Sequence, residues 1–286
     1  MKIKTSRALS FISIAIIYLL ASVVGIISYF YIPASDLWLK LLIADVIATV
    51  FTFIFSLIFN NASVYDPYWS VQPIIIIFAF ALNNTLTLPG ILLIIAITIW
   101  GVRLTANWAY TFKDLTHQDW RYTMLKEQTK KFYPIINFIG IHMVPTLIVY
   151  ACTLPAVYVI KLAPTFNAGS IIFFICSLLC VLLQGTADIQ MHKYRQDKTT
   201  PFIRIGLWKY SRHPNYLAEI LIWWTVGLAS VCVLKDSWYL LGGAILNTIL
   251  FFSVGIPMAD KRQSKKEGFK EYKKQTRMLL PIYKHV

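Results

Sequence analysis

Long apolar runs recur along the whole chain, and they constrain its fold more than any other feature. Short polar segments separate them, and most approach the roughly 20 residues that a helix needs to cross a hydrocarbon core about 30 Å thick. We predict eight membrane spans, over residues 8–31, 37–59, 71–82, 88–108, 135–160, 170–186, 216–233 and 239–256. The third is short, so a re-entrant hairpin formed with the fourth is an alternative.

The composition supports a membrane protein. Hydrophobic residues make up 57% of the chain and charged residues only 14%, whereas soluble domains carry about a quarter charged residues. The first apolar run is also too long for a removed signal peptide. We therefore predict an all-α fold, a polytopic integral membrane helical bundle of seven to eight transmembrane helices that forms a single membrane domain over residues 1–286.

The basic residues are distributed very unevenly between the two sides of the predicted bundle. Of the 27 lysines and arginines, all but Lys40, Lys161 and Lys235 fall on the side that carries both termini and the long polar loops. Because Lys and Arg accumulate in cytoplasmic loops, we predict a multi-pass protein with both termini in the cytosol. The net charge of +14 is then mainly a topology signal. The expected partner is the lipid bilayer, with no nucleic acid and no obligate protein partner.

The cysteines do not predict a metal site or a disulfide framework. All four fall inside predicted spans, where Cys176 and Cys180 share one helical face without a histidine or further cysteine beside them. Metal sites need a fuller set of thiolate, imidazole or carboxylate ligands. We predict packing roles for the cysteines and no bound metal.

The stretch "SRHPNYLAEILIWW" (211–224) places many hydrogen-bonding groups at the start of an apolar span. Pro214 suits the first turn of a helix, where its missing N–H costs nothing. The free N–H groups of that turn favour an anion. Asn215, Tyr216 and Glu219 share one helix face. An ionisable group such as Glu219 is costly in lipid, so it should face the protein interior with a partner.

The preceding span ends in a second polar stretch, "LLQGTADIQMHKYRQD" (182–197), which places Gln184, Asp188 and Arg195 on one side of a helix. Arginine pairs with phosphate through two parallel hydrogen bonds, while carboxylate and amide groups suit ribose hydroxyls and a carboxamide. The two helix ends are therefore predicted to meet in a nucleotide pocket. The alternative is a positively charged helix end above one buried hydrogen-bond network.

Three segments carry a family resemblance, namely "GLWKYSRHPNYLAEILIWW", "GIPMADKR" and "GFKEYKKQTRMLLP". They resemble the steroid 5-alpha-reductase C-terminal superfamily, and within it the branch labelled a domain of unknown function. The resemblance extends from about Asn60 to Pro281. It implies an enzyme that binds NADPH from the cytosolic side through its C-terminal helices and reduces a carbon–carbon double bond in a lipophilic substrate.

The resemblance also implies residue roles. Residues 1–134 would form most of a lipid-substrate pocket and residues 135–286 the NADPH pocket. The implied cofactor-binding residues are Gln184, Asp188, Arg195, Arg204, Tyr210, Arg212, His213, Asn215, Tyr216, Glu219 and Arg262.

The segment "VYDPYWSVQP" (64–73) aligns with the region where steroid reductases place a glutamate that works with a tyrosine. The resemblance puts Asp66 at the position of the catalytic acid, with Tyr65 or Tyr68 as hydrogen-bond donors. A carboxyl group donates only when it is protonated, so its pKa must be raised by burial. The alternative is an aromatic turn at the membrane interface, where Tyr and Trp are common.

Two other functions stay open. An R-H-P-x-Y stretch followed by a glutamate and a G-F-x-x-Y element also resembles isoprenylcysteine carboxyl methyltransferases, which use S-adenosylmethionine. That cofactor has no phosphate and needs fewer arginines, so Arg195, Arg204 and Arg212 favour the reductase. The third possibility is a non-catalytic lipid-binding or scaffold protein.

Overall fold

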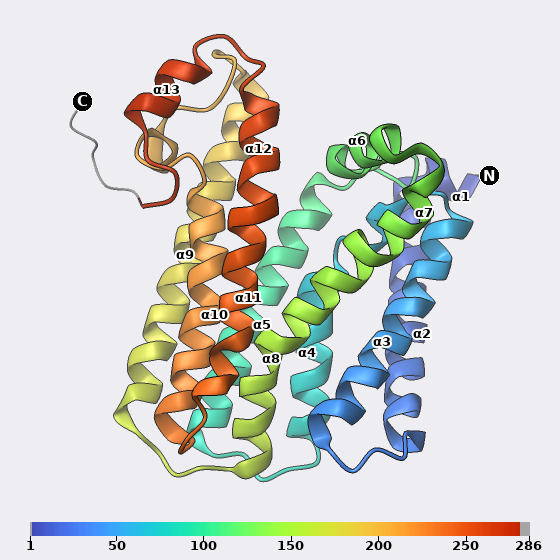
Figure 1. The fold of residues 1–286 in the computed structure, drawn as a ribbon, viewed down its shortest axis with the longest axis vertical. Helices are drawn as coiled ribbons and strands as arrows, with labels where there is room; N and C mark the ends of the chain where they lie inside the picture. The colour runs from blue at the N-terminus through green and yellow to red at the C-terminus, as the bar shows by residue number, and fades with distance from the viewer. Residues whose placement is uncertain (1, 281–286) are drawn as a thin grey trace. The chain divides into compact units, whose positions relative to one another are not determined.

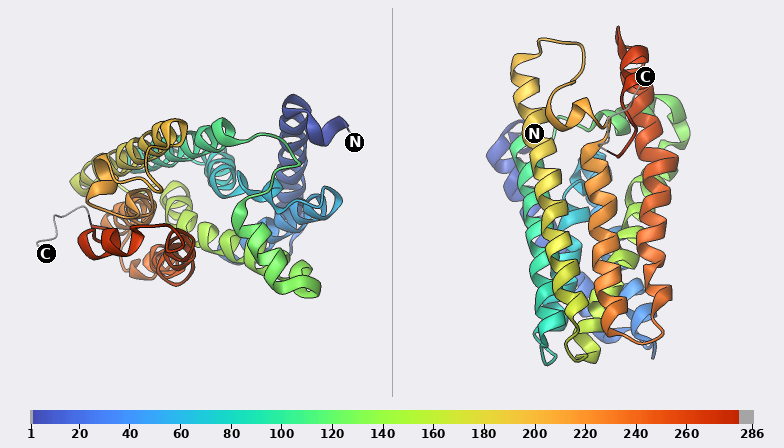
Figure 2. Two further views of the ribbon diagram at one scale, coloured as in Figure 1. Left: turned by 90° about the horizontal axis from the view of Figure 1, so that it is seen from above. Right: turned by 90° about the vertical axis from the view of Figure 1, so that its left-hand side faces the viewer.

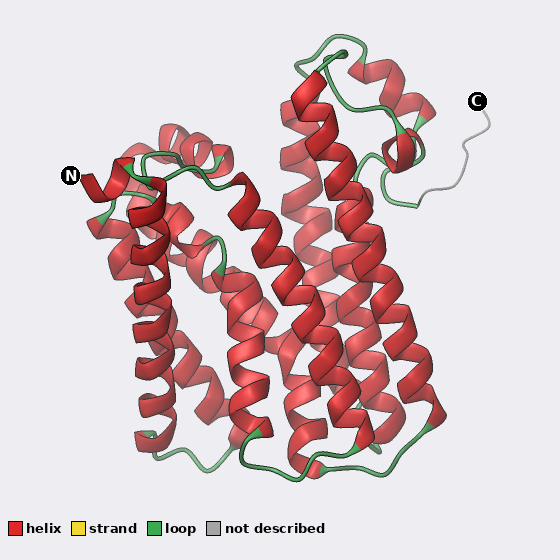
Figure 3. Cartoon of the chain, turned by 180° about the vertical axis from the view of Figure 1, so that it is seen from behind, coloured by secondary structure: helices red, strands yellow, loops and turns green. Residues whose placement is uncertain are grey.

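The structure is a computed structural model that describes residues 2–280, and it is built of helices (Figures 1 and 3). No strand forms over those residues, in which Ser211 and Arg277 make an isolated β-bridge. The α-helices are α1 (Lys2–Thr5), α2 (Arg7–Tyr31), α3 (Leu37–Ile58), α4 (Tyr68–Ala81), α5 (Leu88–Thr111), α6 (Trp120–Thr129), α7 (Tyr133–Ile136), α8 (Val144–Leu162), α9 (Ala168–Asp197), α10 (Pro214–Val233), α11 (Gly242–Leu250), α12 (Ile256–Gln263) and α13 (Phe269–Gln275).

Short segments of other helix types connect these α-helices. Four are 3₁₀-helices, η1 (Ala62–Tyr65), η2 (Lys130–Phe132), η4 (Gly206–Lys209) and η5 (Trp238–Leu241). Two are π-helices, η3 (Asn137–Met143) and η6 (Phe251–Gly255). Each π-helix ends two residues before a proline, Pro145 or Pro257. Because proline removes a backbone donor and its ring clashes with the carbonyl four residues earlier, the wider π-turn is a physically reasonable adjustment at both places.

Seven helical stretches of the described chain are long and apolar enough to cross a membrane, which confirms the all-helical membrane fold class. They are Arg7–Tyr31, Leu37–Ile58, Leu88–Thr111, Trp120–Leu162, Ala168–Asp197, Pro214–Val233 and Trp238–Gln263. The predicted third span forms α4, but this helix has only 14 residues. The seven spans fall within the predicted range of seven to eight, and the shorter α4 accounts for the eighth apolar run.

The polar stretch that follows the sixth apolar run is helical, as its spacing predicts. The apolar run ends near residue 186, but the helix continues to Asp197 and has 30 residues. At 1.5 Å per residue it is about 45 Å long, which exceeds the hydrocarbon thickness of about 30 Å. Its last turns, which carry the polar residues from Asp188 to Arg195, therefore extend the helix well past its apolar part.

The helices form two compact units. Unit 1 comprises Met1–Asn83 and Leu104–Leu154, and unit 2 comprises Asn84–Arg103 and Pro155–Val286. The units alternate along the chain, whereas the sequence interpretation placed a single functional boundary after residue 134.

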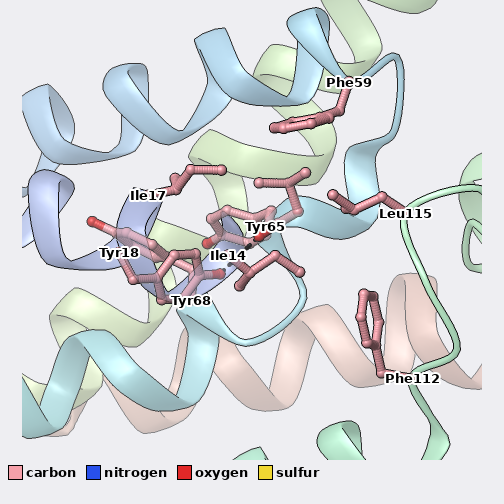
Figure 4. Close-up of a cluster of buried hydrophobic side chains, with 9 residues drawn as sticks. Ile14, Ile17, Tyr18, Phe59, Tyr65, Tyr68, Phe112 and Leu115 are labelled. Carbon is pink, nitrogen blue, oxygen red and sulfur yellow. Dashed lines mark hydrogen bonds between the residues drawn. The ribbon is translucent and has the colours of Figure 1, made fainter. Parts of the chain in front are cut away.

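An aromatic cluster forms the core of unit 1 (Figure 4). Tyr18 from α2 packs against Tyr68 from α4, and Tyr65 stacks on Tyr68 with ring centroids 5.2 Å apart. The hydroxyl of Tyr18 donates to the carbonyl of Val64 at 2.9 Å. These contacts fix the short segment between α3 and α4. The buried members of the cluster are Ile14, Ile17, Tyr18, Phe59, Val64, Tyr65, Tyr68, Phe112 and Leu115.

In unit 2, α9, α10 and the α11–α12 stretch run side by side (Figure 2). The hydroxyls of Ser177 and Thr225 bond across the α9–α10 interface at 2.8 Å. At the polar end of these helices the C-terminal segment is bound in place, because Tyr272 donates to the carbonyl of Trp208 at 2.5 Å. The C-terminal segment therefore helps to shape the polar end of unit 2.

Candidate functional site

A buried carboxylate lies at the centre of the polar contacts of unit 2. Glu219 is 4% exposed. Its Oε2 accepts hydrogen bonds from Trp100 Nε1 at 2.9 Å and from Gln184 Nε2 at 2.7 Å, and its Oε1 accepts one from Trp223 Nε1 at 3.3 Å. The expectation that Glu219 faces the protein interior with partners is confirmed. Because buried charges need such partners, this network joins α5, α9 and α10.

One helical turn further along α5 and α9, an ion pair follows. Arg103 Nη1 lies 2.6 Å from Asp188 Oδ2. The Nε and Nη2 of the same guanidinium are buried and have no hydrogen-bond partner. Asp188 was a predicted site residue, but Arg103 was not. The available signal was an arginine inside the apolar run 88–108, where charged residues are rare and functional.

A second group of polar residues connects the start of α10 to the C-terminal segment. Asp260 Oδ1 accepts from His213 Nε2 at 2.9 Å, and its Oδ2 accepts from Arg212 Nη2 at 3.2 Å. Arg212 Nη1 also donates to the carbonyl of Thr276 at 2.7 Å. The side chains of Arg212 and His213, which were predicted to bind a cofactor, both bond to Asp260 in the structure. The ring of Tyr216 stacks on that of His213 at 5.3 Å.

The remaining predicted cofactor residues are more accessible. Asn215 is half-buried, and four side chains are exposed at the same end of unit 2, those of Arg195, Arg204, Tyr210 and Arg262. Burial, and then the charges of Arg262 and Lys198, lower the pKa of Lys266. The cations here are therefore close enough to repel one another, and their combined field favours an anionic group.

Unit 1 contains its own buried polar group. Tyr68 donates to Asp45 Oδ1 at 2.8 Å, and Gln72 Nε2 donates to Asp45 Oδ2 at 2.8 Å. All three side chains are buried, and Asp45 is 5% exposed. The sequence signal for this group is the lone carboxyl group of Asp45 inside the apolar run 37–59, where an ionisable residue needs a partner.

The other two predicted catalytic residues have different partners. Tyr65 shares a 2.8 Å hydrogen bond with the hydroxyl of Thr146. Asp66 accepts from the hydroxyl of Tyr122 at 2.8 Å. Burial, and next the nearby carboxylate of Asp119, raise the pKa of Asp66 to about 7. The predicted acid and the predicted tyrosines therefore have different hydrogen-bond partners, and Tyr68 bonds to Asp45.

Over residues 2–280, no group of three or more His, Cys, Asp or Glu side chains is arranged to hold a metal ion.

Comparisons with known proteins identify a family and a relative. A family described as "Protein of unknown function (DUF1295)" matches residues 52–276. The chain is 28% identical over 198 residues to a protein of Schizosaccharomyces pombe designated uncharacterized protein C594.04c. That alignment covers 57% of this chain and 56% of the yeast protein, so the chain spans a little over half of the relative's length. No solved structure matches the chain.

Proposed function

The chain belongs to the DUF1295 family, and on that premise we propose that it is a membrane-embedded reductase. In this proposal NADPH is the reductant, and the substrate is a lipophilic enone or enoyl compound whose carbon–carbon double bond is reduced. The resemblance to the steroid 5-alpha-reductase superfamily supports the reaction class, and the seven membrane spans support a lipophilic substrate.

The observation that carries the proposal is the buried pair of Asp45 and Tyr68 in unit 1. When a conjugated double bond is reduced, negative charge develops on the carbonyl oxygen and must be met by a fixed donor. A phenol beside a carboxyl group in an apolar site can serve as that donor. Gln72 holds the second carboxyl oxygen of Asp45 at 2.8 Å, so the geometry of the pair is set before any substrate binds.

Each residue of this group has a distinct role in the proposal. In the free protein the one hydroxyl proton of Tyr68 is donated to Asp45. In the proposal Asp45 is protonated when the substrate is bound and donates to the phenolic oxygen, so that Tyr68 donates its own proton to the substrate carbonyl oxygen and Asp45 replaces it. The cofactor supplies the hydride when it is bound. The surrounding aromatic rings, Tyr18 and Tyr65 among them, exclude water, which strengthens the interaction between the donor and the developing charge.

The residues that would hold NADPH are the accessible ones at the polar end of unit 2. Arg195, Arg204 and Arg262 suit its phosphates, and the cations around Lys266 already repel one another, as its lowered pKa indicates. Asn215 suits the carboxamide or a ribose hydroxyl. Arg212, His213, Gln184 and Glu219 bond within the protein, so we assign them to positioning. The excess of Lys and Arg at this end supports a cytosolic orientation.

A methyltransferase that uses S-adenosylmethionine is the rival assignment. Transfer of a methyl group from a sulfonium requires no donor to a carbonyl oxygen, so Asp45 and Tyr68 would have no chemical role in it. The arginines at the end of unit 2 would also lack a phosphate to bind.

The experiment compares ligands on the full chain, purified in neutral detergent. Binding of NADPH, NADH and S-adenosylmethionine is measured, and oxidation of NADPH is then followed with a panel of lipophilic enones. We expect NADPH to bind and Tyr68→Phe to reduce turnover by about 10²-fold or more with little change in NADPH affinity. Tyr18→Phe, in the same aromatic cluster, is the matched control. Binding of S-adenosylmethionine without binding of either dinucleotide would overturn the proposal.

A further inference from the structure

We propose that Arg103 and Asp188 of unit 2 form an oxyanion-binding site, which takes a phosphate or carboxylate group of a ligand. The proposal does not depend on the reductase assignment. It follows from the hydrogen bonding of the Arg103 guanidinium, in which one nitrogen is paired and the other two are not.

The pair is bound through only one edge of the guanidinium. Arg103 Nη1 contacts Asp188 Oδ2 at 2.6 Å, while Nε and Nη2 are buried and have no partner among the described residues. Nε–H and Nη2–H point in parallel from one side of the planar group. That side matches two oxygens of a carboxylate or phosphate. The unused edge is therefore the one best suited to bidentate binding.

An ion pair with a purely structural role would look different. Arginine and aspartate that only neutralise each other commonly meet through two parallel hydrogen bonds, but Asp188 uses one oxygen on one nitrogen here. Buried polar groups are nearly always hydrogen-bonded. Two unpaired donors on the same buried cation therefore indicate that a further acceptor belongs at this position.

The position is held in place and partly exposed. Trp100 lies one turn before Arg103 on α5 and Gln184 one turn before Asp188 on α9, and both bond to Glu219. This network fixes the spacing of the two helices. The side chains of Arg103 and Asp188 are 18% and 14% exposed, so the pair is partly open to solvent, and the covered Nε and Nη2 become reachable when a neighbouring side chain moves.

The test uses the full chain in nanodiscs of neutral phosphatidylcholine at constant ionic strength. The probes are inorganic phosphate, NADPH, and phosphatidic acid added to the nanodisc, and the readout is the rise in the thermal unfolding midpoint, which reports binding to the native state. Arg103→Lys keeps the positive charge beside Asp188 but loses the two-donor edge. We expect it to lower the affinity for the protecting probe about tenfold or more. Arg277→Lys, at an exposed arginine, should have no effect.

The three probes distinguish the source of the oxyanion. Protection by phosphate and NADPH that Arg103→Lys removes indicates a soluble ligand, and protection confined to phosphatidic acid indicates a lipid headgroup; both support the site. Equal protection of wild type and Arg103→Lys by every probe, or no protection at all, overturns it. If phosphate protects but NADPH does not, the oxyanion site stands and the reductase assignment fails.

The affinity of the Asp188→Asn variant for the protecting probe is a second readout. It would not change if the ion pair had only a structural role. Without the carboxylate, the guanidinium charge is no longer neutralised, so the affinity of the protecting probe should rise several-fold even if the protein is less stable. A lower unfolding midpoint with unchanged affinity would mean that the pair serves only to join α5 and α9.

Discussion

Gln184 Nε2 donates a 2.7 Å hydrogen bond to Glu219 Oε2, which joins α9 to α10 at a buried carboxylate. Trp100 Nε1 donates to the same oxygen at 2.9 Å. A single acidic side chain therefore connects three helices of unit 2, and both the Arg103–Asp188 pair and the start of α10 depend on that connection.

Replacing Glu219 with glutamine should destabilise unit 2. The three N–H groups that donate to Glu219 come from Trp100, Gln184 and Trp223. Glutamine at this position removes the negative charge and places an NH₂ group, itself a donor, against one or more of them. Since hydrogen bonds to charged groups are worth about 1.5–3 kcal/mol each, we expect the free energy of unfolding to fall by about 2 kcal/mol or more. Thermal or denaturant unfolding of purified protein measures this. Glu267→Gln, at an exposed carboxylate, is the control; equal stability of both variants would contradict the structural role of Glu219.

Asp66 should make the stability depend on pH in a defined direction. Its pKa is raised from 3.8 to about 7, by burial first and then by Asp119. The folded state therefore binds the proton more tightly than the unfolded state, and the free energy of unfolding should fall as the pH rises from about 4 to about 7 and then level off.

Asp66→Asn removes this titration, so the variant should lose that part of the pH dependence and be the more stable protein at pH values above about 7. Unfolding is measured across the pH range for both proteins. Asp114→Asn is a control of opposite sign, because hydrogen bonds from Thr116 and His117 hold the pKa of Asp114 well below its ordinary value. Identical pH profiles for wild type and Asp66→Asn would contradict the assignment.

Tyr65 and Tyr68 should respond differently to loss of their hydroxyls. Tyr65 bonds to Thr146, so Tyr65→Phe should lower the free energy of unfolding by about 1 kcal/mol and change turnover only a few-fold. Tyr68→Phe removes the proposed donor and should reduce turnover far more than it reduces stability. Parallel measurements of turnover and unfolding on both variants decide this. A larger loss of turnover in Tyr65→Phe than in Tyr68→Phe would indicate that Tyr65 is the catalytic donor.

Gly206 occupies a position that excludes a side chain. Its φ is +56°, and a Cβ there would lie 2.4 Å from Gln190 Nε2. Gln190 Oε1 also accepts from the backbone N–H of Leu207 at 2.9 Å. Gly206→Ala should therefore lower the free energy of unfolding by about 1–3 kcal/mol.

Gly242→Ala is the matched control for this change, because a Cβ at Gly242 meets no atom within 4 Å. The double variant Gly206→Ala with Gln190→Ala separates the two causes. It relieves the clash, so its loss of stability should be smaller than the sum of the two single losses. Strict additivity in unfolding experiments would show that the clash contributes nothing.

The apolar runs determined the helical membrane fold by themselves. A backbone in lipid must satisfy its own hydrogen bonds, and a helix does so within one segment, so long apolar runs predict long helices without knowledge of their neighbours. Helical spacing of polar residues likewise predicted that α9 continues after its apolar run ends, because polar residues also favour a helix once it has left the hydrocarbon.

Only the tertiary structure decided which polar side chains meet. Asp45 and Tyr68 are 23 positions apart, and Arg103 and Asp188 are 85 positions apart. Sequence spacing determines which residues share a face of one helix. Which helix that face meets depends on packing between distant segments. For that reason Asp45 and Arg103 emerged from the folded protein, although each is an ionisable residue visible within an apolar run.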